Sequence, residues 1–158
     1  MTQPHILCDA MLGSLCRWLR FFGIDCEYAG VEASDAEVGA RAEAEGRWLL
    51  TADRELAGRG PRTMLVRSLD LEDQLVEVLG RLRLEVRPDL ELSRCSHCNG
   101  SLVEQARDQV GEDVPPYVLE TAERFKRCGC CRRVFWPGTH SKKILARMQR
   151  VVDRLDEG

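Results

Sequence analysis

Short apolar segments alternate with helical patterns through the first half of the chain, and this alternation limits the possible folds more than any other feature. The strand-like segments lie at residues 6–8, 24–29, 47–51 and 63–68. Helical patterns follow them at residues 12–23, 34–46, 53–60 and 70–82. Strands that alternate with helices form βαβ units, which build a parallel sheet covered by helices. We therefore predict an α/β fold with a parallel sheet flanked by helices.

The sequence changes character near residue 92. Residues 1–91 carry 17 acidic and 11 basic side chains, a net charge of −6. Residues 92–158 carry 9 acidic and 12 basic side chains, a net charge of +3, and hold five of the eight cysteines. An irregular stretch around Pro115-Pro116 follows the first cysteine pair, and residues 141–155 show a helical pattern. We predict two units, residues 1–91 and residues 92–158.

No apolar run approaches the roughly 20 residues that cross a membrane, so we expect no membrane association. The N-terminus lacks the basic and then apolar pattern of a secretion signal, which favours a cytoplasmic location. In a reducing cytoplasm, cysteines serve as thiols or metal ligands more often than as disulfides.

Two C-x-x-C pairs, Cys95 with Cys98 and Cys128 with Cys131, are separated by 29 residues. Four thiolates at this spacing are typical of a tetrahedral structural Zn²⁺ site. Cys130 makes the second pair ambiguous, but the register favours Cys131 as the ligand. The region has few large apolar residues, so bound zinc would replace part of a core. A redox pair is the alternative, although redox C-x-x-C motifs come singly and follow a strand of a βαβ unit.

The other cysteines and the neighbouring histidine have simpler interpretations. His97 lies between the first two expected ligands, and we expect it to point outward. Cys8, Cys16 and Cys26 fall within apolar strand or helix patterns and are interpreted as small core residues.

Acidic side chains follow two predicted strands, at Asp9 and Asp53. Further acids stand at predicted helix starts: Asp35, Glu37, Asp70 and Asp73. Each one alone fits a helix cap or a first-turn acid. Ligands, however, collect beyond the carboxyl ends of parallel strands, and Mg²⁺ or Mn²⁺ would offset the repulsion among several carboxylates there. Such a site predicts hydrolysis of a phosphodiester, and the absence of P-loop, Rossmann and nucleophile-elbow motifs disfavours nucleotide hydrolysis by those routes.

Four segments together resemble one known family. They read "DAMLGSLCRWLRFFGIDCEY", "SDAEV…A…EGRWLLTADREL", "RCSHCNGSL" and "F…CGCCRRVFWPGTH". Nearly the whole chain resembles, in order, the Mut7-C RNase family, in which a PIN-like domain precedes a zinc ribbon. The resemblance implies a PIN-like nuclease domain at residues 1–91 and a zinc ribbon with a C-terminal helix at residues 92–158. It also implies RNA as the substrate and a catalytic Mg²⁺ or Mn²⁺.

The resemblance also assigns roles to individual residues. The family's strand-one acid falls on Asp9, its helix-start acid on Asp35, and the acid after L-L-T on Asp53, and these three would ligate the catalytic metal. The ribbon ligands fall on the two C-x-x-C pairs. No motif fixes the fourth catalytic acid, for which we rank Asp73 ahead of Asp70 and Glu37.

The chain departs from the family pattern at three positions. Cys16 replaces the usual aliphatic residue or alanine, and Cys130 is an extra cysteine. Ala52 replaces the usual basic residue after L-L-T, while Arg54 is retained. None of these changes removes an expected ligand, but one basic group fewer near the site could weaken phosphate binding.

Several basic and aromatic residues are candidates for RNA contact. They are Arg17, Arg20, Arg54, Arg133, Trp136 and His140. Basic groups neutralise phosphates, and aromatic rings stack on unpaired bases, which favours single-stranded RNA. Ordinary surface charge is the alternative for Arg17 and Arg20, and Trp136 could instead cover the zinc site. His140 could contact phosphate or cap the last helix.

The sequence thus predicts a metal-dependent ribonuclease with a zinc ribbon that assists RNA binding. The alternative is a non-catalytic zinc-ribbon module that binds RNA or a protein partner. A toxin-like endonuclease that needs an antitoxin and a redox protein are further alternatives.

Overall fold

The computed structural model describes residues 2–158 and contains two sheets. The first is a four-stranded parallel sheet in the order β2-β1-β3-β4. Its strands are β1 (Ile6–Cys8), β2 (Cys26–Tyr28), β3 (Trp48–Thr51) and β4 (Thr63–Leu65). The predicted α/β class with a parallel sheet flanked by helices is confirmed.

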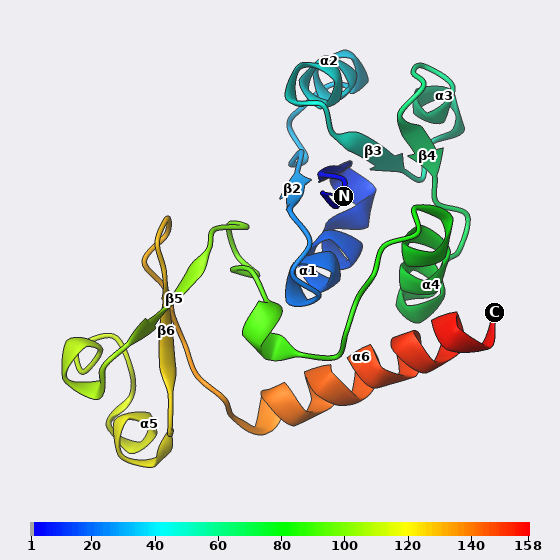
Figure 1. The fold of residues 1–158 in the computed structure, drawn as a ribbon. Coiled ribbons are helices and arrows are strands. Elements are labelled where there is room, and N and C mark those ends of the chain that lie inside the picture. The colour runs from blue at the N-terminus through cyan, green and yellow to red at the C-terminus, as the bar shows by residue number, and fades with distance from the viewer. Residues whose placement is uncertain (1) are drawn as a thin grey trace.

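Helices connect these strands and cover both faces of the sheet. They are the 3₁₀ helix η1 (Ala10–Leu12), α1 (Gly13–Phe21), α2 (Asp35–Glu45), α3 (Arg54–Ala57) and α4 (Leu71–Arg81). Figure 1 shows α1 and α4 on one side of the strands and α2 and α3 on the other. Helix α2 begins with a capping box between Ser34 and Glu37 and ends at Gly46, whose φ of 65° is left-handed. These bounds agree with the helical pattern predicted over residues 34–46.

Two apolar clusters hold the helices to the sheet. Ile6, Cys8 and Leu50 face the larger cluster, which includes buried residues of α1, α4 and α6 (Thr139–Glu157). Leu7 and Leu49 face the smaller cluster, beneath α2 and α3. Because successive strand residues point to opposite faces, the continuous apolar strands supply both clusters.

The second half of the chain forms a three-stranded antiparallel sheet, β5-β6-β7, with short helices around it. Its elements are η2 (Leu90–Leu92), β5 (Leu102–Gln105), η3 (Arg107–Gln109), α5 (Pro116–Thr121), β6 (Phe125–Cys128) and β7 (Val134–Phe135). Helix α6 then leaves this sheet and returns to α4, so that the C-terminus lies beside the first half (Figure 1). Among residues 2–158, no helix has both the length and the apolar character that a bilayer span requires.

Candidate functional site

The first candidate site lies where β1 and β3 end. These strands pair in parallel with Cys8 opposite Leu50, so the residues that follow them leave the sheet at the same edge. The backbone N–H of Asp9 donates to the carbonyl oxygen of Leu50 over 3.0 Å and extends the pairing by one residue. The structure therefore places Asp9 and Asp53 at one edge, as the sequence predicts.

Thr51 connects the two aspartates. Its hydroxyl donates a hydrogen bond to Oδ2 of Asp9, and the same Oγ1 accepts the backbone N–H of Asp53 over 2.9 Å. Thr51 is fully buried, so no water competes for its hydroxyl. This side chain holds the Asp9 carboxylate in a fixed position relative to the Asp53 backbone.

Asp9 is a buried acid that has no basic partner among residues 2–158. Only 7% of its surface is exposed, and its Oδ1 accepts the backbone N–H of Met11 over 3.1 Å. Across the described residues 2–158, no Lys, Arg or His side chain forms an ion pair with it. Buried charges in proteins are ordinarily paired or coordinate a metal. The Asp9 carboxylate thus fits a divalent cation.

Asp53 is exposed and serves as the N-cap of α3. Its Oδ1 accepts backbone N–H groups from Glu55 at 2.7 Å and Leu56 at 3.2 Å. These bonds fix the direction of the carboxylate and occupy one of its oxygens. The cap is therefore compatible with coordination through the other oxygen.

The remaining candidate acids lie in other settings. Asp35 is the exposed first residue of α2, and Asp70 caps α4. The Asp73 carboxylate forms an ion pair with Arg154 of α6 over 2.7 Å. Among residues 2–158, no three carboxylates have oxygen atoms within 4.8 Å of one another. The structure thus gives Asp73 an arginine partner from α6, and its ranking as fourth acid stays a prediction.

The expected basic residues near the acids separate into two groups. Arg17 and Arg54 are exposed, as is Arg133 in the second half. Arg20, in contrast, is 6% exposed, with Nε bonded to the Cys26 carbonyl at 2.7 Å and a terminal nitrogen bonded to the Ser96 carbonyl at 3.2 Å. Arg20 is thus covered partly by the second half of the chain, and its role as a phosphate contact stays a prediction.

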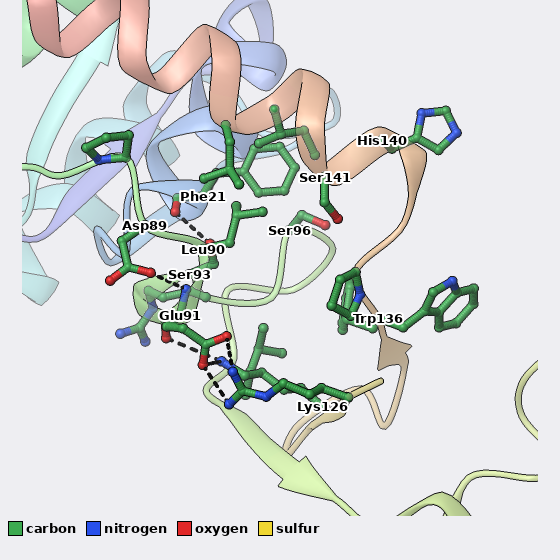
Figure 2. A pocket seen from close by; sticks show the side chains of 18 residues that line it. Phe21, Asp89, Leu90, Glu91, Ser93, Ser96, Lys126, Trp136, His140 and Ser141 are labelled. Carbon is green, nitrogen blue, oxygen red and sulfur yellow. Dashed lines mark hydrogen bonds and ion pairs between the residues drawn. The ribbon is translucent and has the colours of Figure 1, made fainter. Parts of the chain in front are cut away.

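A pocket of about 470 Å³ lies between residues 88–96, the antiparallel sheet and the start of α6. Trp136 and His140 line it, and Figure 2 shows both at the same side of the pocket. At the opposite side, Glu91 pairs with Lys126 at 2.8 Å and with Arg124 at 3.1 Å. These ion pairs neutralise part of the positive charge that the sequence concentrates here.

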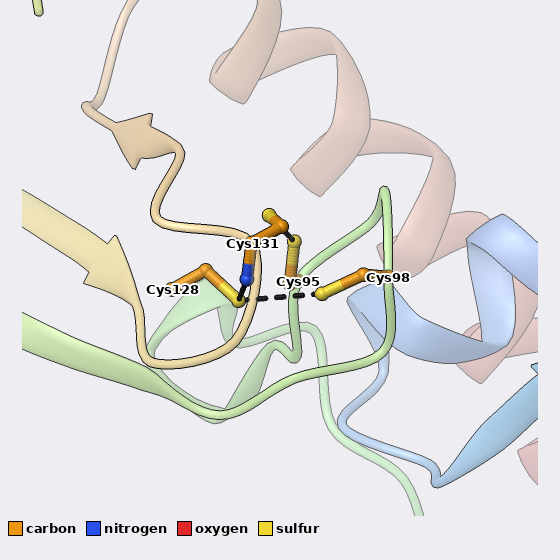
Figure 3. Close-up of side chains that lie close together, drawn as sticks. All are labelled: Cys95, Cys98, Cys128 and Cys131. Carbon is orange, nitrogen blue, oxygen red and sulfur yellow. Dashed lines mark hydrogen bonds between the residues drawn. The ribbon is translucent and has the colours of Figure 1, made fainter.

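The second candidate site is a cluster of four thiols. Cys95, Cys98, Cys128 and Cys131 have sulfur atoms that all lie within 4.8 Å of one another. Figure 3 shows the side chains converging from two separate loops. The sulfurs of Cys95 and Cys131 are 3.7 Å apart, and those of Cys98 and Cys128 are 3.4 Å apart. Cys130 is exposed and lies outside the cluster. Four converging sulfurs are the donor set of structural zinc, so this cluster could hold Zn²⁺.

The surroundings of the four sulfurs shift the pKa values of two thiols in opposite directions and leave little room beside them. Burial raises the pKa of the Cys95 thiol to about 12. Burial also opposes the charged form of Cys98, but a backbone N–H from Gly100 and the neighbouring thiols lower its pKa to about 6. A Cβ atom at Gly100 would lie 2.7 Å from the Cys128 sulfur, so only glycine fits beside the cluster.

Asn99 joins the cysteine cluster to the parallel sheet, a role that the sequence does not reveal. Its Nδ2 donates to Asp25 at 2.7 Å and to Glu27 at 3.0 Å, and its Oδ1 accepts the Cys26 N–H at 3.1 Å. Burial raises the pKa of Asp25, but hydrogen bonds from Arg47, Asn99 and other partners outweigh it and lower the pKa to about 2. The first cysteine loop is therefore anchored to β2.

Comparison with known proteins supports the resemblance noted in the sequence. A family model described as the Mut7-C RNAse domain matches residues 4–148 of the 158-residue chain. The matched range includes both aspartates at the sheet edge and all four clustered cysteines. Searches of curated proteins and of solved structures found no significant match. The chain belongs to the Mut7-C RNAse domain family.

Proposed function

We propose that this protein is a ribonuclease that hydrolyses phosphodiester bonds of single-stranded RNA with Mg²⁺ or Mn²⁺. The observation that carries this proposal is Asp9, a buried carboxylate that has no basic partner in the described part of the chain and that Thr51 connects to Asp53. Membership of a family described as an RNase domain supports RNA as the substrate.

Each residue of the acid site has a defined task in this proposal. Asp9 and Asp53 bind the cation, and Thr51 keeps the Asp9 carboxylate in one orientation. Asp35, at the start of α2, completes the ligand set through water. When bound, either ion offsets the charge that develops on the phosphate oxygens and makes water a stronger acid. Asp73, which pairs with Arg154, is the candidate for a fourth acid.

The remaining candidates contact the RNA. Arg17, Arg54 and Arg133 are exposed and can approach phosphates. Trp136 and His140 line the pocket beside α6, where an unpaired base can stack. Zn²⁺ in the cysteine cluster has a structural role and holds the loops that carry this surface.

Cleavage assays with matched variants test the proposal. A labelled single-stranded RNA is incubated with the full chain, with Mg²⁺ or Mn²⁺ and with a chelator in parallel. We expect divalent-dependent cleavage that falls by at least about 100-fold in Asp9→Asn and Asp53→Asn, while RNA binding persists. Asp156→Asn, a change at an exposed acid near the end of α6, is the control and should cleave like the original chain.

Two results would contradict the proposal. Cleavage that survives equally in Asp9→Asn would place the activity elsewhere or in a contaminant. RNA or protein binding by the original chain without any divalent-dependent cleavage would favour the non-catalytic binding module.

A further inference from the structure

Three more cysteines converge inside the core of the first half. Cys8 comes from β1, Cys16 from α1 and Cys26 from β2, and their sulfur atoms all lie within 4.8 Å of one another. The Cys26 sulfur is 3.3 Å from that of Cys16 and 3.5 Å from that of Cys8. Each residue is at most 1% exposed. Three soft donor atoms from separate elements thus lie together at one buried position.

A buried positive charge lies next to this group. Arg20 donates from Nε to the carbonyl oxygen of Cys26, and its other bond goes to the Ser96 carbonyl. Within residues 2–158, Arg20 forms no ion pair with a carboxylate. A buried guanidinium without a carboxylate is costly unless negative charge of another kind lies close by. Thiolates of the three-cysteine group would be such a source, because Arg20 bonds to the backbone of Cys26, a member of the group.

We propose that Cys8, Cys16 and Cys26 form a buried binding site for Cu⁺, a soft monovalent cation. Soft thiolate ligands select Cu⁺ and zinc among the common metals. Zinc in closed protein sites takes four ligands, whereas this group contains three members among the described residues. Cu⁺ is stable with two or three sulfur donors, so it fits the group as it stands.

The spacing and the charges are consistent with this ion. Metal–sulfur bonds of about 2.3 Å at trigonal angles separate ligand sulfurs by about 4.0 Å, so the sulfurs would move apart by roughly 0.5 Å. Binding forms bonds to two thiolates and to the third, neutral thiol, and it releases two thiol protons to solvent. Copper stays in the +1 state throughout. The complex carries a net charge of −1, which the Arg20 guanidinium offsets.

A copper count on matched variants tests the site. The reduced, zinc-loaded full chain is titrated anaerobically with Cu⁺ against a chromogenic Cu⁺ chelator, and a second sample is refolded with the ion to remove any barrier to entry. We expect the original chain to hold one Cu⁺ more per molecule than Cys16→Ala or Cys26→Ala, with affinity at this site at least 100-fold lower in either variant. Cys130→Ala, at the exposed cysteine, is the control and should match the original chain.

A zinc-sensitive dye in the same titration reports any zinc released from the four-cysteine cluster. It therefore distinguishes copper binding at the three-cysteine group from displacement of zinc. Circular dichroism verifies that the variants fold. If the variants do not fold, the test uses the original chain alone. Copper uptake without zinc release, together with sulfur-only coordination in X-ray absorption, then supports the site. Equal copper in all folded variants, or copper uptake only as zinc leaves, would overturn the proposal, as would the absence of uptake after refolding.

Discussion

Asn99 shows how a single side chain can couple two parts of this molecule. It is 4% exposed and stands between Cys98 and Gly100. It bonds to the backbone of β2, to Glu27 of that strand and to Asp25 just before it. Its backbone has a φ of 72°, a left-handed conformation that asparagine and glycine tolerate better than other residues. Both the side-chain hydrogen bonds and the backbone conformation therefore favour asparagine at position 99.

Replacement of Asn99 by glycine separates these two contributions. Asn99→Gly keeps the left-handed backbone but leaves the buried N–H of Cys26 without its acceptor, so we expect a loss of about 1–3 kcal/mol in the free energy of unfolding. Urea denaturation measures this loss. Arg83→Gly, at an exposed position with a φ of 51°, is the control and should not destabilise the chain. A neutral Asn99→Gly would mean that the bonds to β2 contribute nothing.

The sequence predicts the positions of the acids at the sheet edge better than it predicts the contacts of Arg20 and Asp73. Parallel pairing requires β1 and β3 to end at the same edge, so Asp9 and Asp53 can be placed from the strand pattern alone. The burial of Arg20 cannot be predicted in this way, because the covering carbonyl belongs to Ser96, 76 residues away in the chain. The partner of Asp73 cannot be predicted for the same reason, because Arg154 lies far along the chain, in α6.

Helix α6 belongs by packing to the first half, although it follows the cysteine-rich part in the chain. Met148 and Val151 are fully buried in the cluster that includes Leu75 and Val78 of α4. On the outside of this contact, Glu72 pairs with Arg147 at 3.1 Å and with Arg150 at 2.7 Å. The helix thus ties the antiparallel sheet to the parallel one.

Truncation of a buried side chain on α6 should destabilise the first half of the chain. For Met148→Ala we expect a loss of about 2–5 kcal/mol in the free energy of unfolding, because a fully buried side chain leaves a cavity. Met11→Ala, at a residue that is 75% exposed, is the control and should change stability by at most about 0.5 kcal/mol. Urea unfolding followed by far-ultraviolet circular dichroism compares the two. Equal stabilities would show that α6 does not contribute to this core.

Among the helices and strands, those with a strong apolar pattern are predicted from the sequence, and those with a weak pattern are not. The spacing of apolar residues predicts a helix over 141–155, and the structure extends it to Thr139–Glu157. The same pattern does not predict that this helix packs against α4. Strands β5 and β6 fall in a stretch that the sequence leaves irregular, because their partly exposed charged residues give no clear alternation.

At the scale of the whole molecule, the two sheets have different sources of stability. The parallel sheet lies between two apolar clusters, whereas the antiparallel sheet packs on a small group formed by Val110, Val114, Val118, Ala122 and Phe125. Zinc in the four-cysteine cluster would supply the second part with binding free energy that its small core lacks.

A methyl group beside the cluster should weaken zinc binding. In Gly100→Ala the new Cβ would lie 2.7 Å from the Cys128 sulfur and 3.3 Å from the Cys98 sulfur, so we expect the affinity for Zn²⁺ to fall at least 10-fold. Competition with a chromogenic zinc chelator measures the change. Gly129→Ala is a matched control in the second loop, because its Cβ would meet nothing closer than the Ser101 carbonyl oxygen at 3.8 Å. Unchanged affinity in Gly100→Ala would argue against zinc at this cluster.

The central claim is that a divalent cation binds between two strand ends and is held there by aspartates. A crystal of the full chain soaked in Mn²⁺ and measured for anomalous scattering tests this claim most directly. We expect an anomalous peak within coordination distance of the Asp9 and Asp53 carboxylates, and no peak there in Asp9→Asn. Ordered Mn²⁺ elsewhere on the molecule, with no peak at these two carboxylates in the original chain, would contradict the account.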